Sequence, residues 1–506
     1  MLNTALDTAT HTAAAARHSR YDVVIVGAGL AGCATARALV RADPHRRRRI
    51  LLVDRYRDVH PRFSGELIHP RGAQILDDLG LYPALHGVGG VEIAGFAVFE
   101  NADAAFVDLS YADVPDERPR GLAIHHKDLV RTLRKQLRRD DHVELLEGWA
   151  VTDLVREDAR DDRGDHIRGV VLQDKDGDRG RHEIRADLVI AADGKSSTVR
   201  KLAGISHQGR ETIGFTGGVE LTDASLPRPG YAHVFLGAWG PVLAYPISRE
   251  ADGTVRTRVT IDLPRVLPAK GEALKQYLLR TYVPFVPAPL SAQLAAAIMA
   301  HEGPLHMAPT VNLPAPSAAM PGLALVGDAA GCSHPITASG MTMGLRDAET
   351  LGIQARRRAD APDAEPWLDA ESLRRYRVEH DRYVPTRQAL ADSIYEAFRG
   401  GEDGSRAIRR ALFDYWGSGD TARSRSMALL SCSERRPHVF LTEYLKTARH
   451  ALETSLVPQH ASMYPVGDRV RRAAGAAKLA SHKLGLVAQV MWAQVRPNWL
   501  TRIETR

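Results

Sequence analysis

Short apolar runs, each followed by a glycine or an acidic residue, recur along the chain and predict buried strands. They are Tyr21 to Val26 (YDVVIV), Ile50 to Val53, Asp187 to Ala192 (DLVIAA) and Leu323 to Val326. Runs of this kind are typical of strands that are covered on both faces of a sheet. An Ala-rich segment follows the first run as far as Ala42 and predicts a helix, so we expect strand and helix to alternate here.

A different pattern occupies Arg210 to Asp262. Apolar and polar residues alternate there, for example in AHVFLGAW from residue 232 and VTID from residue 259. Alternation with turn signals between the runs predicts the strands of a second sheet. This sheet is the expected substrate lobe.

The turn after the first strand reads Gly27-Ala28-Gly29-Leu30-Ala31-Gly32. Gly27 permits a tight turn, Gly29 lets a pyrophosphate approach the backbone, and Gly32 allows the helix to pack closely on the strand. The N-terminus of that helix offers N–H donors to phosphate. Asp54 ends the second strand 22 residues beyond Gly32, where a carboxylate can bind a ribose hydroxyl. Together these features predict a dinucleotide site.

Three further segments favour FAD over NAD(P) as the bound dinucleotide. Asp193-Gly194 and Gly327-Asp328 each follow a late strand and can return carboxylates and N–H groups to the same ligand. The third segment is Arg62 to Leu67 (RFSGEL), shortly after Asp54. No second Gly-x-Gly-x-x-Gly follows a strand, so NAD(P)H is expected to act as the ultimate electron donor, either directly or through a reductase.

Charge and cysteine usage exclude other classes. The net charge of +6 is accounted for by residues 468–506, which contain eight Lys/Arg and two acidic residues. The rest of the chain is balanced and has no basic stripe with interleaved aromatics, so we expect no nucleic-acid partner. The three cysteines are widely spaced, which indicates a reducing compartment, and neither they nor the histidines show a metal-ligand spacing. No apolar window is long enough to cross a bilayer.

Gly27-x-Gly29-x-x-Gly32, Asp193-Gly194 and Gly327-Asp328 together resemble the flavoprotein monooxygenases of the para-hydroxybenzoate hydroxylase fold. Within that superfamily the chain is most similar to squalene epoxidases, in collinear order over about residues 21 to 450. The strings that carry this likeness are Arg62 to Gly72, His125-His126 with Leu133-Arg134, Gly240 to Ser248, His334-Pro335-Ile-Thr337-x-x-Gly340-Met341-Thr342, and Phe413-Asp414-Tyr415 with Arg436-Pro437.

The resemblance implies where FAD is held. It places Asp54 and Arg55 at the adenosine half. Arg62, Arg134 and Asp328 would contact the phosphate–ribityl portion, where the planar arginine fork suits phosphate. For the two arginines the alternative is a surface salt bridge, and for Asp328 it is a helix cap. The full predicted cofactor set is Gly27, Gly29, Gly32, Asp54, Arg55, Arg62, Arg134, Asp193, Asp328, Gly340 and Met341, of which the last two would meet the isoalloxazine.

The resemblance also implies the reaction. A flavin C4a-hydroperoxide would epoxidise an alkene of a prenyl or terpenoid lipid, squalene or a related isoprenoid. The alkene attacks the distal oxygen directly, so no acid–base residue and no metal is required. A dry, apolar pocket is required, because water promotes loss of peroxide. Candidates for lining that pocket, or else for the core of its sheet, are His69, Phe96, Phe215, Phe235, Leu243, Tyr245 and Pro335.

Three positions depart from the family pattern. His69 stands where Gln is usual and Phe96 where Tyr is usual, so a hydroxyl is lost and an imidazole is gained. His69 could hold a polar group of a different substrate, but local hydrogen bonding is the favoured interpretation. Ala338-Ser339 replaces a frequent Gly-Gly. These changes leave the flavin chemistry intact, and another prenyl chain fits as well as squalene.

Apolar residues recur at helical spacing from Val470 to Val495, and Trp492 and Trp499 flank the end of that segment. A basic amphipathic helix with aromatic anchors can lie in a membrane interface, and the resemblance supports this location; packing on the body is the alternative. We therefore expect a cytoplasmic protein, peripheral on the membrane, with an isoprenoid substrate, O2 and a separate reductase as partners.

Two other activities stay open at this point: a geranylgeranyl reductase-like saturation of prenyl double bonds, and aromatic hydroxylation. A flavin halogenase is disfavoured because Trp239 stands alone, without a Trp-x-Trp-x-Ile-Pro signature.

The predicted fold class is α/β (α+β), with a Rossmann-type FAD-binding domain interleaved with a β-sheet substrate domain, plus a C-terminal helical region. The expected divisions are a disordered lead-in at 1–20, the FAD-binding domain at 21–205 with part of the substrate lobe at 85–125, the substrate domain at 206–318, a return to the FAD-binding domain at 319–360, and the helical region at 361–506 with the membrane-associating tail from 468.

Overall fold

The computed structural model describes most of the chain between residues 16 and 456. The residues outside the description are 1–15, 61–62, 64–65, 104, 116, 158–165, 176–179, 206–208, 210, 304, 364, 402, 457–466, 468–473 and 475–506. The predicted cofactor residue Arg62 and the predicted tail helix lie outside the described residues.

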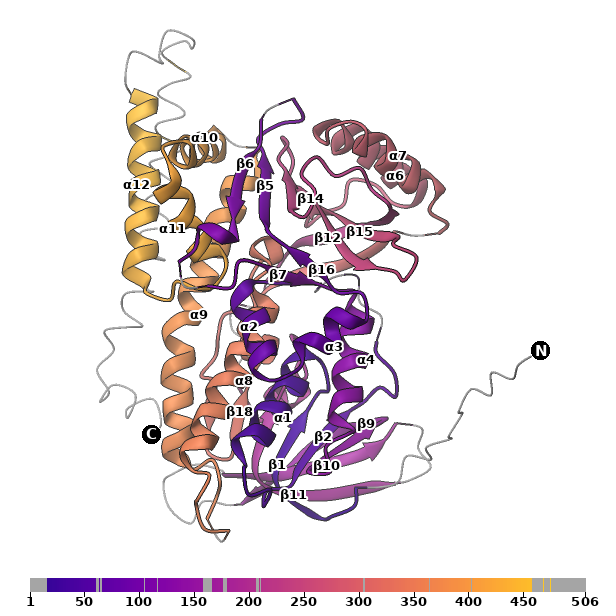
Figure 1. Cartoon of the computed structure of the whole chain (residues 1–506), viewed down its shortest axis with the longest axis vertical. Coiled ribbons are helices and arrows are strands. Elements are labelled where there is room, and N and C mark those ends of the chain that lie inside the picture. The colour runs from indigo at the N-terminus through magenta and orange to yellow at the C-terminus, as the bar shows by residue number, and fades with distance from the viewer. Residues whose placement is uncertain are drawn as a thin grey trace, which may run out of the picture.

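A mixed sheet of eight strands among the described residues forms the core of the first lobe (Figure 1). Its strands are β1 Arg20–Val26, β2 Ile50–Asp54, β8 Val143–Glu147, β9 Trp149–Glu157, β10 His166–Asp174, β11 Arg181–Ala191, β17 Ala319–Met320 and β18 Leu323–Leu325. The spatial order is β17-β18-β11-β1-β2-β8, and β10 and β9 extend from β11 by antiparallel pairing. β1 pairs in parallel with β2 and β11, and β11 pairs in parallel with β18. The four apolar runs of the sequence are therefore neighbouring strands.

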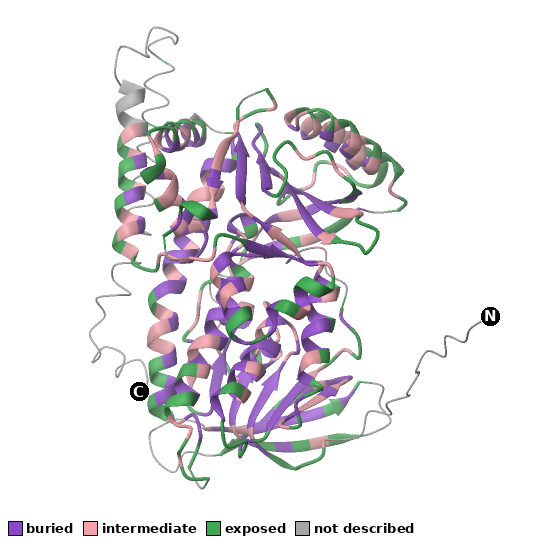
Figure 2. Cartoon of the chain, in the orientation of Figure 1, coloured by how far each residue is buried: buried purple, intermediate pink, exposed green. Residues whose placement is uncertain are grey.

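Both faces of this sheet are buried, which explains why its strands are almost wholly apolar. Val23 and Ile25 of β1 point into a core that they share with α1 (Leu30–Ala42), α4 (His126–Leu137) and α8 (Gly340–Arg357). Val24 and Val26 point the other way, into a core completed by β9 and β10. Figure 2 shows the buried residues concentrated in these strands and in the helices that cover them.

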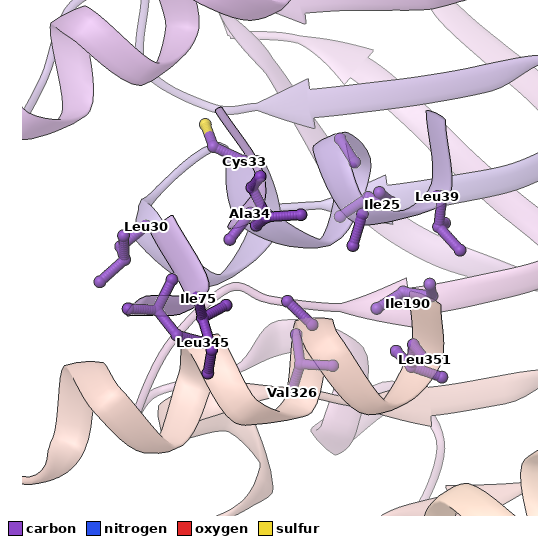
Figure 3. Packing of buried hydrophobic residues seen from close by; sticks show 14 of the residues in the cluster. Ile25, Leu30, Cys33, Ala34, Leu39, Ile75, Ile190, Val326, Leu345 and Leu351 are labelled. Atoms are coloured by element: carbon purple, nitrogen blue, oxygen red, sulfur yellow. The ribbon is translucent and has the colours of Figure 1, made fainter. Parts of the chain in front are cut away.

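Helices α1 and α8 pack closely on each other above the sheet, and Figure 3 shows Leu345 and Leu351 of α8 facing the side chains of α1 and the strands. Small residues permit this approach. A Cβ on Gly344 would lie 3.2 Å from Ala31 Cβ, and one on Gly352 would lie 3.0 Å from Ala38 Cβ. Helix α8 is thus held directly against the Gly27 to Gly32 motif and the helix that follows it.

A seven-stranded sheet among the described residues forms the second lobe, in the order β16-β12-β15-β14-β13-β5-β6. Its strands are β5 Gly95–Phe99, β6 Val107–Ser110, β12 Glu211–Thr222, β13 Ala232–Phe235, β14 Val242–Arg249, β15 Val255–Pro264 and β16 His306–Asn312. The pairing is antiparallel except between β13 and β5. Helices α6 (Gly271–Thr281) and α7 (Leu290–Ala300) cover one face of this sheet (Figure 1), and their leucines pack on Val259, Ile261 and Leu263 of β15.

Short elements connect the two lobes. A small sheet has the order β3-β7-β4. The short elements of the described chain are β3 Leu67–Ile68, β4 Val91–Ile93, β7 Gly121–Ala123, α2 Pro70–Asp78, α3 Tyr82–Gly87, α5 Thr198–Leu202, and the 3-10 turns η1 Tyr111–Asp113, η3 Gly327–Ala330 and η4 Pro335–Thr337, with η2 Val283–Phe285 between α6 and α7 of the second lobe. Residues 85–125 therefore supply strands to both the small sheet and the second lobe, while the predicted domain limits themselves stay predictions.

Among the described residues, four helices follow α8. They are α9 Ala370–Arg399, α10 Asp403–Gly417, α11 Asp420–Leu430 and α12 Pro437–Leu456. Phe398, Leu412 and Trp416 from these helices share an apolar core with Phe96 and Tyr245 of the second lobe. Within the described residues, none of the helices combines the length and the apolarity that a membrane span requires.

Buried arginines fasten these helices to backbone carbonyls. Arg409 of α10 donates to Ala397 O at 3.1 Å, Phe398 O at 2.6 Å and Gly237 O at 2.8 Å. Arg387 of α9 likewise donates to a carbonyl in the last turn of α11, at Leu429, and to one beyond its end, at Glu434. The helical region is thereby joined both to itself and to the loop after β13.

Candidate functional site

The turn between β1 and α1 has the geometry that its three glycines predict. Gly27 has φ of +106°, and a Cβ there would lie 2.5 Å from Ala192 O. A Cβ on Gly32 would lie only 1.9 Å from Gly27 O, so Gly32 serves helix packing and does not itself line the cavity. A Cβ on Gly29 would meet no protein atom within 4 Å. The open side of the turn is therefore at Gly29, next to the free N–H groups of the α1 N-terminus.

Asp54 and Arg134 form one network under this turn. Asp54 Oδ2 accepts from Ala28 N at 2.8 Å and from Arg134 Nη2 at 2.9 Å. Arg134 also donates to Ala28 O at 2.9 Å and to Glu147 Oε1 at 2.9 Å. Because its guanidinium is engaged by protein acceptors and lies beside Asp54, Arg134 positions the dinucleotide loop. Arg134 also lines the cavity, and its predicted phosphate–ribityl contact stays a prediction.

The two late carboxylates reach the same space from the other strands. Asp193 Oδ2 accepts from Thr198 N at 2.7 Å and Val199 N at 3.1 Å, which caps α5. Its Oδ1 is buried and has no hydrogen-bond partner among the described residues, so it can serve a ligand. Asp328 lies across from the start of α8, where a Cβ on Gly340 would be 3.8 Å from Asp328 Oδ1.

A second carboxylate network holds the Gly327 turn in place. Asp347 of α8 accepts from Gly327 N at 2.8 Å through Oδ2, and its Oδ1 contacts His380 Nδ1 at 2.8 Å and Tyr383 Oη at 2.9 Å. Burial alone would lower the pKa of His380, but the Asp347 carboxylate outweighs burial and raises that pKa above its ordinary value. The turn that carries Asp328 is thus tied to α8 and α9 at once.

One cavity of about 1410 Å³ connects the Gly29 turn, Asp54, Asp193 and Asp328. The predicted cofactor residues on its wall are Gly27, Gly29, Asp54, Arg55, Arg134, Asp193, Asp328, Gly340 and Met341. Single-ligand pockets usually occupy about 300–1,000 Å³, so this cavity can hold a dinucleotide and a further molecule. The open approach at Gly29 and the unpartnered Asp193 Oδ1 fit FAD, since one admits a pyrophosphate and the other can accept a hydrogen bond.

The opposite end of the cavity lies under the second lobe. Phe96, Leu243, Tyr245 and Pro335 line it, as predicted from the sequence. Phe215 and Phe235 do not. Both pack in the core between the sheet and helices α6 and α7, because successive side chains of a strand point to opposite faces. Of the two alternatives given for these aromatics, lining the pocket is therefore wrong and the core of the sheet is correct.

His69 is also absent from the cavity wall, although it lies one layer behind it. Its Nε2 is 2.7 Å from Thr337 O and its Nδ1 is 2.8 Å from Tyr111 Oη. Since a carbonyl only accepts, Nε2 carries the proton and Nδ1 accepts from the tyrosine. Burial lowers the pKa of His69 to about 4, which keeps the ring neutral. His69 thus has the local structural role, and Phe96 forms the wall in front of it.

The second lobe presents two chemically different halves to the cavity. Phe96 of β5 and Leu243 and Tyr245 of β14 are apolar or aromatic, whereas Arg258, Thr260 and Asp262 line it from the adjacent β15. Arg258 donates from Nε and Nη2 to the two oxygens of the buried Glu66 at 3.0 and 2.7 Å. The predicted apolar pocket thus corresponds to the first half of this wall, and the second half carries charged and hydroxyl-bearing side chains.

Asp262 connects this polar half to the loop between η3 and α8. His334 Nδ1 accepts from Ile336 N at 3.1 Å, so its Nε2 carries the proton and donates to Asp262 Oδ1 at 3.2 Å. The His334 ring stacks on Tyr395 of α9 with centroids 3.9 Å apart. Pro335, next in sequence, is fixed against the second lobe by these contacts.

Comparison with known proteins identifies the family. Residues 185–466 match the family model "Squalene epoxidase", and residues 20–271 match the model "FAD binding domain". The chain is 30% identical over 458 residues to squalene epoxidase erg1 of Aspergillus fumigatus, covering 89% of this chain and 90% of the relative. This chain belongs to the squalene epoxidase family. It is a flavin-dependent monooxygenase with FAD as its cofactor.

A second squalene epoxidase relative agrees with that assignment, and solved structures share the fold. Squalene monooxygenase of Mus musculus is 29% identical over 436 residues, covering 85% of this chain and 71% of the relative. Among solved structures, p-nitrophenol 4-monooxygenase PnpA of Pseudomonas putida superposes with a TM-score of 0.66 at 20% identity, covering 83% of this chain and 100% of that one. A flavin-dependent brominase, Bmp2, reaches a TM-score of 0.62 at 15% identity over 85% of this chain and 99% of that one. Likeness at this identity shows the fold, and it confirms the predicted fold class.

Sequence reasoning overlooked several groups that shape this squalene epoxidase-family site. Tyr111, Asp347, His380 and Tyr383 gave no local motif, because each acts through a partner distant in sequence. Glu66 lies inside a string that was noticed but was assigned no role. A signal was present for Arg258 and Asp262, since charged residues within an alternating strand pattern imply a buried or cavity-facing polar cluster.

Proposed function

We propose that this member of the squalene epoxidase family epoxidises a double bond of an isoprenoid lipid. The observation that carries the proposal is the single cavity that leads from the Gly29 turn to Phe96 and Leu243. The curated relatives are named squalene epoxidase or squalene monooxygenase, which indicates the same class of substrate here. Squalene is one candidate, and a related isoprenoid is another.

In this proposal FAD lies along the wall from β2 to α8. The pyrophosphate would lie against Gly27, Gly29 and the α1 N-terminus, with Asp54 and Arg55 at the adenosine half. Asp193 Oδ1 and Asp328 would bind the ribityl–phosphate portion, and Gly340 and Met341 would meet the isoalloxazine at the start of α8. N–H groups at that helix end can stabilise negative charge on the ring. Arg62 remains a predicted contact outside the described residues.

Bound FAD, once reduced, supplies the activated oxygen that the alkene attacks. The chain supplies orientation and keeps water out. Phe96 and Leu243 would hold the alkene-bearing part of the chain, and Pro335, fixed through His334 and Asp262, would close the wall between the two ligands. No side chain has to donate a proton to the alkene or remove one from it.

The test uses chemically reduced, FAD-loaded enzyme exposed to 18O2 with a panel of prenyl alkenes, read by mass spectrometry. We expect a product that gains one 18O atom. Saturation of a double bond under anaerobic conditions would instead indicate a geranylgeranyl reductase-like activity, and a phenol-dependent oxidation of NAD(P)H an aromatic hydroxylase. Absence of oxygen gain from every alkene would refute the epoxidase proposal.

Two further parts of the proposal concern partners. NAD(P)H is the ultimate electron donor, either directly or through a separate reductase. Stopped-flow measurement of the rate of flavin reduction by NAD(P)H, with and without an added reductase, distinguishes the two routes. Peripheral membrane contact would use the basic segment 468–506, which the sequence predicts as amphipathic. Binding to anionic liposomes that is unchanged by Arg471→Glu with Arg472→Glu would contradict that contact.

A further inference from the structure

The cavity face of the second-lobe sheet is divided along its strand order. On one side are β5, β13 and β14, whose cavity-facing residues Phe96, Leu243 and Tyr245 are aromatic or aliphatic. On the other are β15, β12 and β16. Their lining residues include the charged or hydroxyl-bearing Arg258, Thr260, Asp262, Thr216, Glu220 and Thr310, interspersed with the apolar Val219, Met307, Ala308, Pro309 and Val311. The boundary runs between the adjacent strands β14 and β15.

Thr260 lies at this boundary and lines the cavity. It pairs across the sheet with Leu243 of β14 on one side and with Gly218 of β12 on the other. A Cβ at Gly218 would lie 1.9 Å from Val259 O, so no side chain can fill the position next to Thr260. Thr260 is only 5% exposed, lines the cavity, and its hydroxyl makes no hydrogen bond to the residues that the structure describes. An available hydroxyl therefore lies on the cavity wall, next to a position that carries no side chain.

The charge on this half selects among polar groups. Glu66, Glu220 and Asp262 contribute carboxylates, and the guanidinium of Arg258 is already bound to Glu66 and 3.5 Å from Glu220. Lys195 stands on the β16 side, where it donates to Pro309 O at 3.1 Å. Carboxylates in excess repel an anionic group such as a diphosphate, whereas a hydroxyl or an N–H can donate to them.

We infer that the substrate is an amphipathic, uncharged isoprenoid. It carries a hydroxyl or N–H group that binds at Thr260 and Asp262, and its hydrocarbon part lies along Phe96, Leu243 and Tyr245. This inference rests on the proposed function and narrows it, because a pure hydrocarbon leaves the Thr260 hydroxyl and the polar half of the wall without a partner. A hydrocarbon that leaves these polar groups unpaired should bind more weakly than an isoprenoid that pairs with them, which gives the site its selectivity.

The test is a binding titration of oxidised, FAD-loaded enzyme, followed through the flavin absorbance spectrum. The ligands are geranylgeraniol, squalene and geranylgeranyl diphosphate in the same detergent. We expect a Kd for geranylgeraniol at least ten-fold lower than for either other ligand. Thr260→Val should raise the geranylgeraniol Kd about ten-fold, as loss of one hydrogen bond does, and leave the squalene Kd within two-fold.

Thr257→Val is the matched control. Thr257 is on the same strand, is fully buried, has an unpaired hydroxyl among the described residues, and is not part of the cavity wall. It should leave all three Kd values unchanged. Squalene binding as tightly as geranylgeraniol, no spectral response to geranylgeraniol, or an equal effect of the two valine variants would each overturn the inference. The 18O2 experiment reports separately on the reaction, so a failure of epoxidation and a failure of this selectivity are distinguishable.

Discussion

At the scale of single residues, the dinucleotide turn separates two requirements that are often discussed together. Gly32 is needed by the fold, since a Cβ there would collide with Gly27 O. Gly29 is needed by the ligand, since a Cβ there would enter open space. The two positions are three residues apart and call for opposite experimental outcomes.

Gly29→Ala should therefore leave the free energy of unfolding of the FAD-free protein within about 0.5 kcal/mol of wild type, as at other unstrained sites. The same change should raise the Kd for FAD at least ten-fold, because the added methyl group occupies the approach of the pyrophosphate. Urea unfolding and flavin fluorescence titration measure the two quantities. Gly32→Ala should instead destabilise the apoprotein; a stable Gly32→Ala protein would contradict the packing argument.

Ala338 combines a left-handed backbone with a residue type other than the glycine that is frequent at this position in the family. It has φ of +49° and ψ of 21°, a left-handed conformation, and it packs against the apolar core of the second lobe while lining the cavity. A non-glycine residue in this region carries a cost of about 1 kcal/mol. The Cβ that incurs this cost also narrows the cavity beside Pro335.

Ala338→Gly should consequently stabilise the protein by about 0.5–1 kcal/mol, measured by urea unfolding. Ala329→Gly provides the comparison, because Ala329 is buried in η3 without a left-handed φ. That change should destabilise, since it removes a buried methyl group and adds freedom to the unfolded chain. Destabilisation by both changes would show that Ala338 is not strained.

At the scale of secondary-structure elements, a buried arginine of α10, Arg409, fastens the C-terminal helices through hydrogen bonds that, among the described residues, all go to backbone carbonyls. The three hydrogen bonds of Arg409 end on carbonyls at the close of α9 and in the loop after β13. Burial lowers the pKa of Arg409 to about 10, so the side chain still carries its charge near neutrality. One arginine thus satisfies carbonyls at the C-terminal end of α9 and also joins α10 to the loop after β13.

Arg409→Met keeps the apolar stem and leaves three carbonyls without donors, which should cost about 3 kcal/mol or more of unfolding free energy. The neighbouring Arg410 is exposed, and Arg410→Met should change that free energy by less than about 0.5 kcal/mol. Chemical denaturation of both variants makes the comparison. Equal stability of the two would mean that the carbonyls find water or other donors.

At the scale of the whole molecule, much of the first lobe could be predicted from sequence because its signals are local. The Gly27 turn, Asp54 and the four apolar runs each lie within a few residues of the element they define. The second lobe was harder to predict from sequence. Alternation of apolar and polar residues identifies the two faces of a strand but does not say what covers each face. Phe215 and Phe235 were candidates for either the pocket or the core, and the structure shows that α6 and α7 cover their face while the polar residues of β15 face the cavity. The pairing of His69 with Tyr111 likewise depends on strand pairings that no local pattern encodes.

The Asp347 network gives the whole protein a defined pH response. The folded-state pKa of His380 is raised, so the folded protein binds a proton that the unfolded chain releases at lower pH. The stabilisation is complete below the unfolded pKa of about 6.5 and is lost as pH rises through the folded value. His380→Gln should flatten the fall in unfolding free energy above that pH. An unchanged slope, measured by urea unfolding at a series of pH values, would exclude His380 as its source.

The interleaving of the two sheets also determines the order in which the molecule can be made. Val189, Ile190 and Ala191 of β11 pair with β18 at Leu323 to Leu325, on the far side of the complete second lobe in sequence. During synthesis at about 5–20 residues per second, that apolar edge waits on the order of ten seconds for its partner strand. Until then it can pair with another nascent chain. Production of this enzyme should therefore depend on chaperones that shield strand edges, and slower translation should increase that dependence.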